Sequence, residues 1–170
     1  MGMMEDKVVI VTGGGRGIGR GISMLMAEHG AKVVVNDLGG GADGEGQDKG
    51  PGQEVVDAIR AKGGDAVLND ESVADWGAAQ RMVEQAKDNF GALHAVVNNA
   101  GILRDRIFHK MSEEEFDAVV AVHLKGCFNV SRAAAETFRN QSSGAFVHMT
   151  STSGLVGNFG QVNYGAAKLG

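Results

Sequence analysis

A tyrosine, a lysine and a serine near the end of the chain have the side chains needed for acid–base chemistry. Tyr164 and Lys168 are four positions apart, so on a helix they share a face. A free phenol has a pKa of about 10, and a neighbouring ammonium lowers it toward neutral pH. Ser151 precedes Tyr164 by thirteen positions and can hydrogen-bond a reacting oxygen. Together these residues predict a general acid/base that interconverts an alcohol and a carbonyl.

A glycine-rich turn near the start of the chain predicts a phosphate site. The apolar residues 8–11 lead into a T-G-x-x-x-G-x-G pattern whose glycines are Gly13, Gly17 and Gly19, and a helical pattern follows up to Gly30. Glycines let backbone N–H groups approach a pyrophosphate, and the helix N-terminus adds partial positive charge. The pattern favours a dinucleotide-binding corner over a simple tight connection.

An acidic residue after the second apolar segment indicates which dinucleotide would bind. Residues 32–36 predict a buried strand, and Asp37 follows Gly19 at close to the roughly 20-residue spacing of a ribose-binding carboxylate. Such a carboxylate accepts hydrogen bonds from the ribose and repels a 2′-phosphate, so it favours NAD over NADP. Arg16 in the turn favours NADP instead, because a base there could pair with that phosphate. We give Asp37 more weight; its alternative role is that of an ordinary turn residue.

Alternating apolar and helical patterns along the chain predict how these residues are brought together. Strands are expected at residues 8–11, 32–36, 65–69, 93–97 and 145–150, with helices between them at residues 18–30, 54–62, 72–89 and 112–140. Right-handed crossovers then imply an α/β fold, a doubly wound parallel Rossmann sheet with strand order 3-2-1-4-5. Gly13, Asp37, Asn98 and Ser151 follow strands, so one ligand at the carboxyl edge could touch all four.

Local signals indicate where the helices begin and where the chain is irregular. Ser72 is expected to cap the third helix, and Ser112 with Glu115 forms a capping box for the fourth. Residues 38–52 are rich in glycine without apolar periodicity, which favours a mobile surface loop. The alternative for that segment is a flap near the adenosine end of the cofactor.

Composition excludes several classes of protein. The chain has 170 residues, which suggests one domain, and a net charge of −5 without a Lys/Arg run argues against nucleic-acid binding. No apolar run is long enough for a membrane span, and the five histidines show no metal-ligand spacing. Cys127 is the single cysteine, which excludes an internal disulfide and fits a reducing, cytoplasmic compartment.

Taken together, these motifs resemble the short-chain dehydrogenase/reductase family. The resemblance is carried by Thr12-Gly13-x-x-x-Gly17-Ile18-Gly19, Asn98-Asn99-Ala100-Gly101, Ser151 and Tyr164-x-x-x-Lys168. It implies that Tyr164 is the catalytic acid/base, that Lys168 binds the nicotinamide ribose and stabilises the phenolate, and that Ser151 orients the substrate oxygen. It further implies a cofactor site formed by the glycine turn with Arg16 and Ile18, by Asp37, by Ser72 and Val73 near the adenine, and by Asn98, Ala100 and Gly101.

A closer resemblance is to the (3R)-hydroxyacyl-CoA dehydrogenase domain of peroxisomal multifunctional enzyme type 2 and its bacterial relatives. Residues 35–40, 99–106, 122–126 and 157–161 carry it. It implies NAD-dependent oxidation of a 3-hydroxyacyl-CoA to a 3-oxoacyl-CoA. Arg104 and Arg106 would then meet CoA phosphates, or else be solvated charges or salt-bridge partners. The alternatives are an NADP-dependent 3-oxoacyl reductase and a non-catalytic NAD-binding module.

Two features depart from the family pattern. His123 stands where many members have Asn, and we interpret it as a subfamily variant. The sequence ends at Gly170, just after Lys168, so residues 1–170 are expected to be a truncated NAD(P)-binding domain with a poorly held catalytic helix and an exposed fifth strand. The resemblance implies a homo-oligomer in the full-length form, and a peroxisomal address could lie in the missing part.

Overall fold

Five parallel strands form one sheet in the computed structural model, which describes residues 2–46 and 48–170. The order is β3-β2-β1-β4-β5, as predicted. All four pairings are parallel, so the carboxyl ends of the strands lie along one edge. The strands are β1 (Val8–Thr12), β2 (Lys32–Asn36), β3 (Ala66–Asn69), β4 (Ala95–Asn98) and β5 (Ala145–His148).

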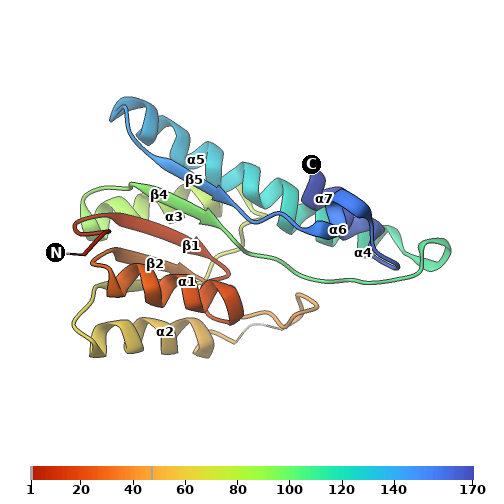
Figure 1. Ribbon diagram of the computed structural model, residues 1–170, viewed down its shortest axis with the longest axis horizontal. Helices are drawn as coiled ribbons and strands as arrows, with labels where there is room; N and C mark the ends of the chain where they lie inside the picture. Colours follow the sequence, from red (N-terminus) through yellow and green to blue (C-terminus); the bar gives the residue numbers. More distant parts are fainter. Residues whose placement is uncertain (1, 47) are drawn as a thin grey trace.

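Helices cover both faces of this sheet and make it a three-layer α/β domain (Figure 1). One face packs against α1 (Gly17–Glu28) and α2 (Gly50–Ala61). The other packs against α3 (Trp76–Phe90) and α5 (Gly126–Asn140). The doubly wound fold expected from the alternating patterns is confirmed.

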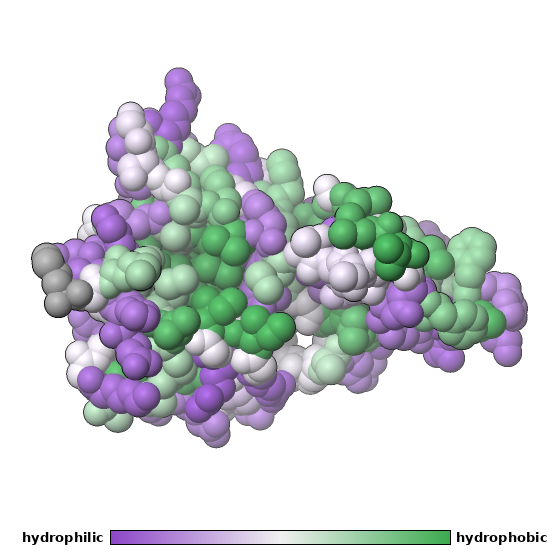
Figure 2. All heavy atoms as spheres, viewed as in Figure 1, coloured by the Kyte–Doolittle hydropathy of each residue, from purple (hydrophilic) through white to green (hydrophobic). Residues whose placement is uncertain are grey.

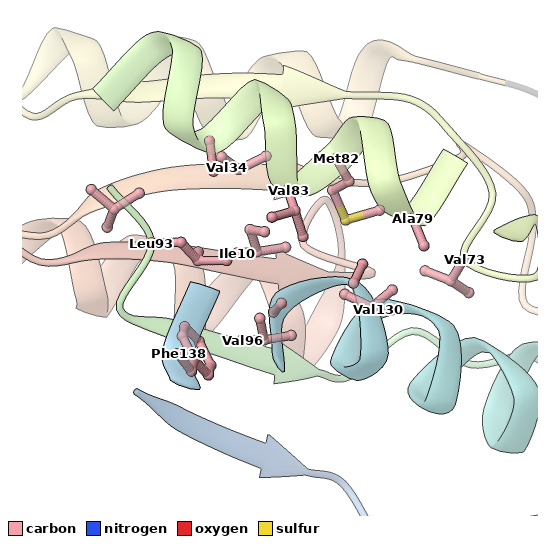
Figure 3. Packing of buried hydrophobic residues seen from close by; sticks show 14 residues of the cluster. Ile10, Val34, Val73, Ala79, Met82, Val83, Leu93, Val96, Val130 and Phe138 are labelled. Carbon is pink, nitrogen blue, oxygen red and sulfur yellow. The ribbon is translucent and has the colours of Figure 1, made fainter. Parts of the chain in front are cut away.

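The central strand shows why the sheet holds together. All five residues of β1 are buried. Val8 and Ile10 join the cluster on the α3–α5 side, which Figure 3 shows closing around Ile10, whereas Val9 and Val11 join the cluster on the α1–α2 side. Full burial of each such side chain stabilises the fold by about 1.5–3 kcal/mol. Burial on both faces explains the unbroken apolar run of this strand.

The long helical stretch after β4 is interrupted by a wider turn. α4 (Glu113–Val120) begins with the predicted capping box: Ser112 Oγ accepts from Glu115 N at 3.2 Å, and Glu115 Oε2 accepts from Ser112 N at 3.0 Å. A π-helical turn, η2 (Ala121–Lys125), then joins α4 to α5. The prediction of one helix over residues 112–140 missed this turn, which re-aims the side chains at its centre.

Two predicted helix starts are wrong. α2 begins at Gly50 instead of residue 54, because Pro51 suits the first turn of a helix, where its missing N–H would have no partner. α3 begins at Trp76, capped by Asp75, whose Oδ1 accepts from Ala78 N at 2.6 Å. Ser72 does not cap α3; its Oγ accepts from Ala74 N at 3.2 Å in the preceding turn.

Two short helices follow β5: α6 (Thr152–Val156) and α7 (Val162–Leu169), and α7 packs against both α4 and α6. A short 3₁₀ helix, η1 (Phe108–Lys110), lies between β4 and α4. β5 is an edge strand with all four residues exposed, as expected. Figure 2 shows hydrophobic residues on this face both over the middle of the molecule and over its C-terminal end. Within residues 2–46 and 48–170, every helix is too short or too polar to cross a membrane.

Candidate active site

A cavity of about 440 Å³ opens at the carboxyl ends of β1, β2 and β4. The residues predicted for the cofactor that line it are Gly13, Arg16, Gly17, Ile18, Gly19, Asp37, Ser72, Val73, Ala100 and Gly101. It is also lined by residues for which the sequence predicted no individual contact with the cofactor: Asn36, Leu38, Gly40, Gly41, Ala42, Gly44, Glu71, Asn99, Ile102 and Val122. The fold therefore brings segments from several separate connections to one hollow.

In the glycine-rich turn, a side chain at Gly13 or at Gly19 would clash with neighbouring backbone atoms. Gly13 has φ +63°, and a Cβ there would lie 2.9 Å from Ala100 Cα. A Cβ on Gly19 would lie 1.9 Å from Gly13 O. Gly17 has φ +50° at the first turn of α1, with open space beside it. The three glycines line the cavity at the N-terminus of α1, where a glycine-rich backbone fits a pyrophosphate.

Two polar side chains hold that turn against the end of β4. Thr12 Oγ1 accepts from Asn99 N and Ala100 N, both at 3.0 Å. Asn99 Nδ2 donates to Thr12 O at 3.0 Å and to Gly13 O at 3.1 Å. Hydrogen bonds thus connect the turn after β1 to the segment after the neighbouring strand β4 without a ligand.

The carboxylate of Asp37 is fixed at the end of β2. Its Oδ2 accepts from Gly15 N at 2.8 Å and its Oδ1 from Gly39 N at 2.9 Å. Both donors are backbone groups of glycine-rich segments, so the negative charge has a defined position on the cavity wall.

Asn98 faces another way. Its Nδ2 donates to Ser131 Oγ at 3.0 Å and lies 3.3 Å from His148 Nδ1, so the side chain joins β4 to α5 and β5 and does not line the cavity. Successive side chains of a strand point to opposite faces, and no signal in the N-N-A-G motif tells which Asn turns toward the ligand. Of the two Asn residues in the motif, Asn99 lines the cavity.

The segment of residues 38–46 and 48–49, which follows β2, is held by several hydrogen bonds and an ion pair. Asp48 N donates to Gly39 O at 2.9 Å, which closes its neck. Its tip reaches the chain after β4, where Leu103 N donates to Ala42 O at 2.8 Å and Arg104 pairs with Glu45 at 3.1 Å. The favoured prediction for residues 38–52 was a mobile surface loop. In the structure, part of this segment lines the cavity, which agrees with the alternative prediction of a flap near the cofactor; the lining residues are Leu38, Gly40, Gly41, Ala42 and Gly44.

Tyr164 and Lys168 share one face of α7, beside the cavity. Lys168 Nζ lies 5.7 Å from the centre of the Tyr164 ring and donates to Met149 O at 2.6 Å. Burial lowers the pKa of Lys168. The structure thus places a half-buried ammonium beside the phenol ring of Tyr164.

His123 joins this pair to the cavity. Its ring packs edge-on against Tyr164 with centres 5.1 Å apart, and a Cβ on the cavity residue Gly101 would lie 2.3 Å from His123 Cε1. Nε2 lies 3.0 Å from Ile102 N and 2.8 Å from Ile102 O, and burial lowers the pKa of this histidine. The sequence marked His123 only as a departure from a pattern; its position between two site residues was not predicted.

Comparison with known proteins now identifies the family. A family model described as short chain dehydrogenase matches residues 7–170. The chain belongs to the short chain dehydrogenase family. A crystal structure of a short chain dehydrogenase from Mycobacterium avium superimposes with a TM-score of 0.92 at 49% identity, over 99% of this chain and 62% of that one.

Curated proteins similar to this short chain dehydrogenase are consistent with that family. A short-chain type dehydrogenase/reductase of Mycobacterium tuberculosis is 57% identical over 98% of this chain, and peroxisomal multifunctional enzyme type 2 of Mus musculus is 49% identical over 98% of it. The chain spans 58% of the length of the first relative and 22% of the second.

Ser151, Arg104 and Arg106 are the remaining residues of this short chain dehydrogenase for which the sequence predicted a role. Ser151 is the N-cap of α6, where its Oγ accepts from Ser153 N at 3.2 Å, which leaves its own proton free to donate. Arg106 pairs with Glu115 at 2.9 Å, and Arg104 with Glu45. Both arginines thus have carboxylate partners, which is the salt-bridge alternative stated for them.

Proposed function

We propose that this protein is an NAD-dependent dehydrogenase that oxidises a 3-hydroxyacyl-CoA to the 3-oxoacyl-CoA. One observation carries the proposal: a glycine-rich cradle with a fixed carboxylate opens next to a Tyr164–Lys168 pair, and His123 contacts both sites. The substrate class rests on the resemblance of residues 99–106 and 157–161. The mouse relative, named a peroxisomal multifunctional enzyme, supports it.

The cavity fits a nicotinamide dinucleotide. The cradle at Gly13, Gly17 and Gly19 would hold the pyrophosphate, and Asp37 would accept from the adenosine ribose hydroxyls. Because Asp37 carries a fixed negative charge there, NAD is favoured over NADP. When bound, the nicotinamide ring accepts the hydride from the substrate carbon.

The protein residues handle the proton and the oxygen. Ser151 Oγ donates a hydrogen bond to the substrate hydroxyl oxygen, since one of its lone pairs is already used by Ser153 N. Tyr164, as phenolate, takes the hydroxyl proton while the C–H bond electrons leave as hydride, so the carbonyl forms without net charge on oxygen. Lys168, held by Met149 O, keeps a positive charge near the phenolate as it accepts that proton.

Replacement of Tyr164 by Phe tests this assignment. The variant keeps the ring that packs against His123 and removes only the hydroxyl. We expect turnover of a 3-hydroxyacyl-CoA with NAD to fall by at least about 100-fold, because a positioned acid/base contributes roughly that factor. NAD binding, measured by calorimetry, should persist.

The comparison must separate three outcomes. Retention of normal turnover by Tyr164→Phe would contradict the catalytic role. Binding of NAD by the unaltered protein without turnover on any 3-hydroxyacyl-CoA would favour the non-catalytic module. Turnover with NADP in preference to NAD would favour the 3-oxoacyl reductase.

A further inference from the structure

Arg16, in the glycine-rich turn, already has partners in the loop formed by residues 38–46 and 48–49. Its Nη1 donates to Gly40 O at 2.7 Å, and its Nη2 lies 3.6 Å from Asp48 Oδ2. Gly40 lines the cavity, whereas Asp48 belongs to the same loop and is not one of the lining residues. The guanidinium is therefore drawn toward the loop.

Asp48 is held in place by contacts that do not involve Arg16. Its Oδ1 accepts from Gly50 N, at the start of α2, at 3.0 Å. Its backbone N–H donates to Gly39 O at 2.9 Å, and a Cβ on Gly39 would lie 2.2 Å from Asp48 O. One carboxylate oxygen is thus anchored to a helix while the other faces Arg16.

This arrangement decides which charges are available at the ribose end of the cavity. Among the cavity-lining residues that the structure describes, Arg16 is the one base, against the acids Asp37 and Glu71. A phosphate on the adenosine ribose, next to Asp37, would need a cation to offset that repulsion. The cation is present, but its Nη1 donates to Gly40 O and its Nη2 is paired with Asp48 at 3.6 Å.

We propose that Asp48 is a specificity-determining residue that keeps Arg16 from pairing with the 2′-phosphate of NADP. It acts with Asp37: one acid repels the phosphate, and the other holds the only base that lines the described cavity wall. This inference rests on the proposed use of a nicotinamide dinucleotide. It explains why a base at position 16 is compatible with a preference for NAD.

The test is a set of binding titrations with NAD and NADP. Asp48→Asn keeps an oxygen for Gly50 N and removes the charge that faces Arg16. The ratio of the NADP to the NAD dissociation constant should fall by about two- to fivefold, the range for an exposed ion pair. Repeating the titrations with Asp37→Asn removes direct repulsion and strengthens NADP binding for measurement.

Arg16→Ala and Asp43→Asn make the test specific. If Asp48 acts by holding Arg16, then Asp48→Asn should leave the ratio unchanged once Arg16 is Ala. Asp43 is the matched control, because it lies in the same loop and its Oδ1 likewise accepts a backbone N–H two positions on, from Glu45 at 3.0 Å. Asp43→Asn should leave the ratio unchanged.

Each contrary result has its own meaning. No change on Asp48→Asn, an equal gain on Asp43→Asn, or a gain that survives Arg16→Ala would overturn the role of Asp48 and leave the proposed dehydrogenase intact. Failure of the unaltered protein to bind either dinucleotide would overturn the proposed function, and this inference with it.

Discussion

The ring of His123 lies between two residues predicted for different tasks, Gly101 at the cofactor and Tyr164 at the reacting group. It is 5% exposed. Its Nδ1 is buried with no hydrogen-bond partner among the described residues. A buried ring in van der Waals contact on two sides has little freedom to move. The space available for a side chain at position 101 is therefore limited by His123, more than twenty positions away in the chain.

Gly101→Ala should destabilise the protein. The added Cβ would lie 2.3 Å from His123 Cε1, and its other nearest neighbours belong to the same buried ring. Overpacking of this kind costs about 1–3 kcal/mol in the free energy of unfolding. Chemical denaturation measures the loss.

Two further variants show whether the ring is the cause. Gly21, within α1, has open space where a Cβ would lie, so Gly21→Ala should raise stability by up to about 1 kcal/mol. In a His123→Ala background, Gly101→Ala should cost much less. An equal cost in both backgrounds would contradict the clash.

At the scale of elements, the start of α3 shows how neighbouring polar residues compete to cap a helix. Ser72 and Asp75 both have side chains that suit an N-cap. Asp75 succeeds because its backbone is extended, with φ −88° and ψ 127°, directly before the helix and its Oδ1 reaches Ala78 N. The side chain of Ser72 closes a turn three positions earlier. Sequence patterns indicated a capping region, and backbone geometry selected the residue.

Removing the true cap should cost more than removing the predicted one. Asp75→Ala is expected to lower the free energy of unfolding by about 1 kcal/mol, because Ala78 N loses its acceptor. Ser72→Ala should cost clearly less. Urea denaturation compares the two, and Asp75→Asn, which keeps an acceptor oxygen, should recover most of the loss. Equal effects at both positions would contradict the assignment.

At the scale of the whole molecule, the half-buried His94 and the buried His123 link stability to pH. His94 Nδ1 accepts from Val8 N at 2.9 Å and so joins the amino ends of β4 and β1. Burial, and to a lesser extent the charge of Lys7, lowers the pKa of His94, and burial lowers that of His123. Protonation of His94 Nδ1 would replace the acceptor with a donor that faces Val8 N–H.

The protein should therefore become less stable in mild acid. A pKa lower in the folded than in the unfolded state means that the unfolded chain binds the proton more readily, so stability is full above the unfolded value of about 6.5 and falls as pH drops below it. The Tm should decrease from about pH 7.5 to 5.5, above the range in which carboxylates titrate. His94→Gln should reduce this pH dependence, whereas His109→Gln, at an exposed site, should not. A pH dependence unaltered by His94→Gln would contradict the assignment.

The sequence by itself determined the strand order, the glycine-rich turn and the capping box of α4. Each depends on a repeating or local pattern: β-branched runs, glycines at fixed spacing, and Ser112 with Glu115. The handedness of crossovers then limits the sheet to a few arrangements, which include the order 3-2-1-4-5. The turn and the capping box can be predicted because their energies come from residues close together in the chain.

Only the tertiary structure decided which side chains meet across the cavity. It turned Asn99 toward the cavity and Asn98 away, placed His123 against Tyr164, and gave Arg16 its partners. It also holds α7, which the sequence predicted to be poorly held: buried Asn163 donates to Arg104 O at 2.9 Å and to Glu115 O at 3.0 Å. An eight-residue helix is marginal in isolation, so its position depends on contacts from segments far away in the chain.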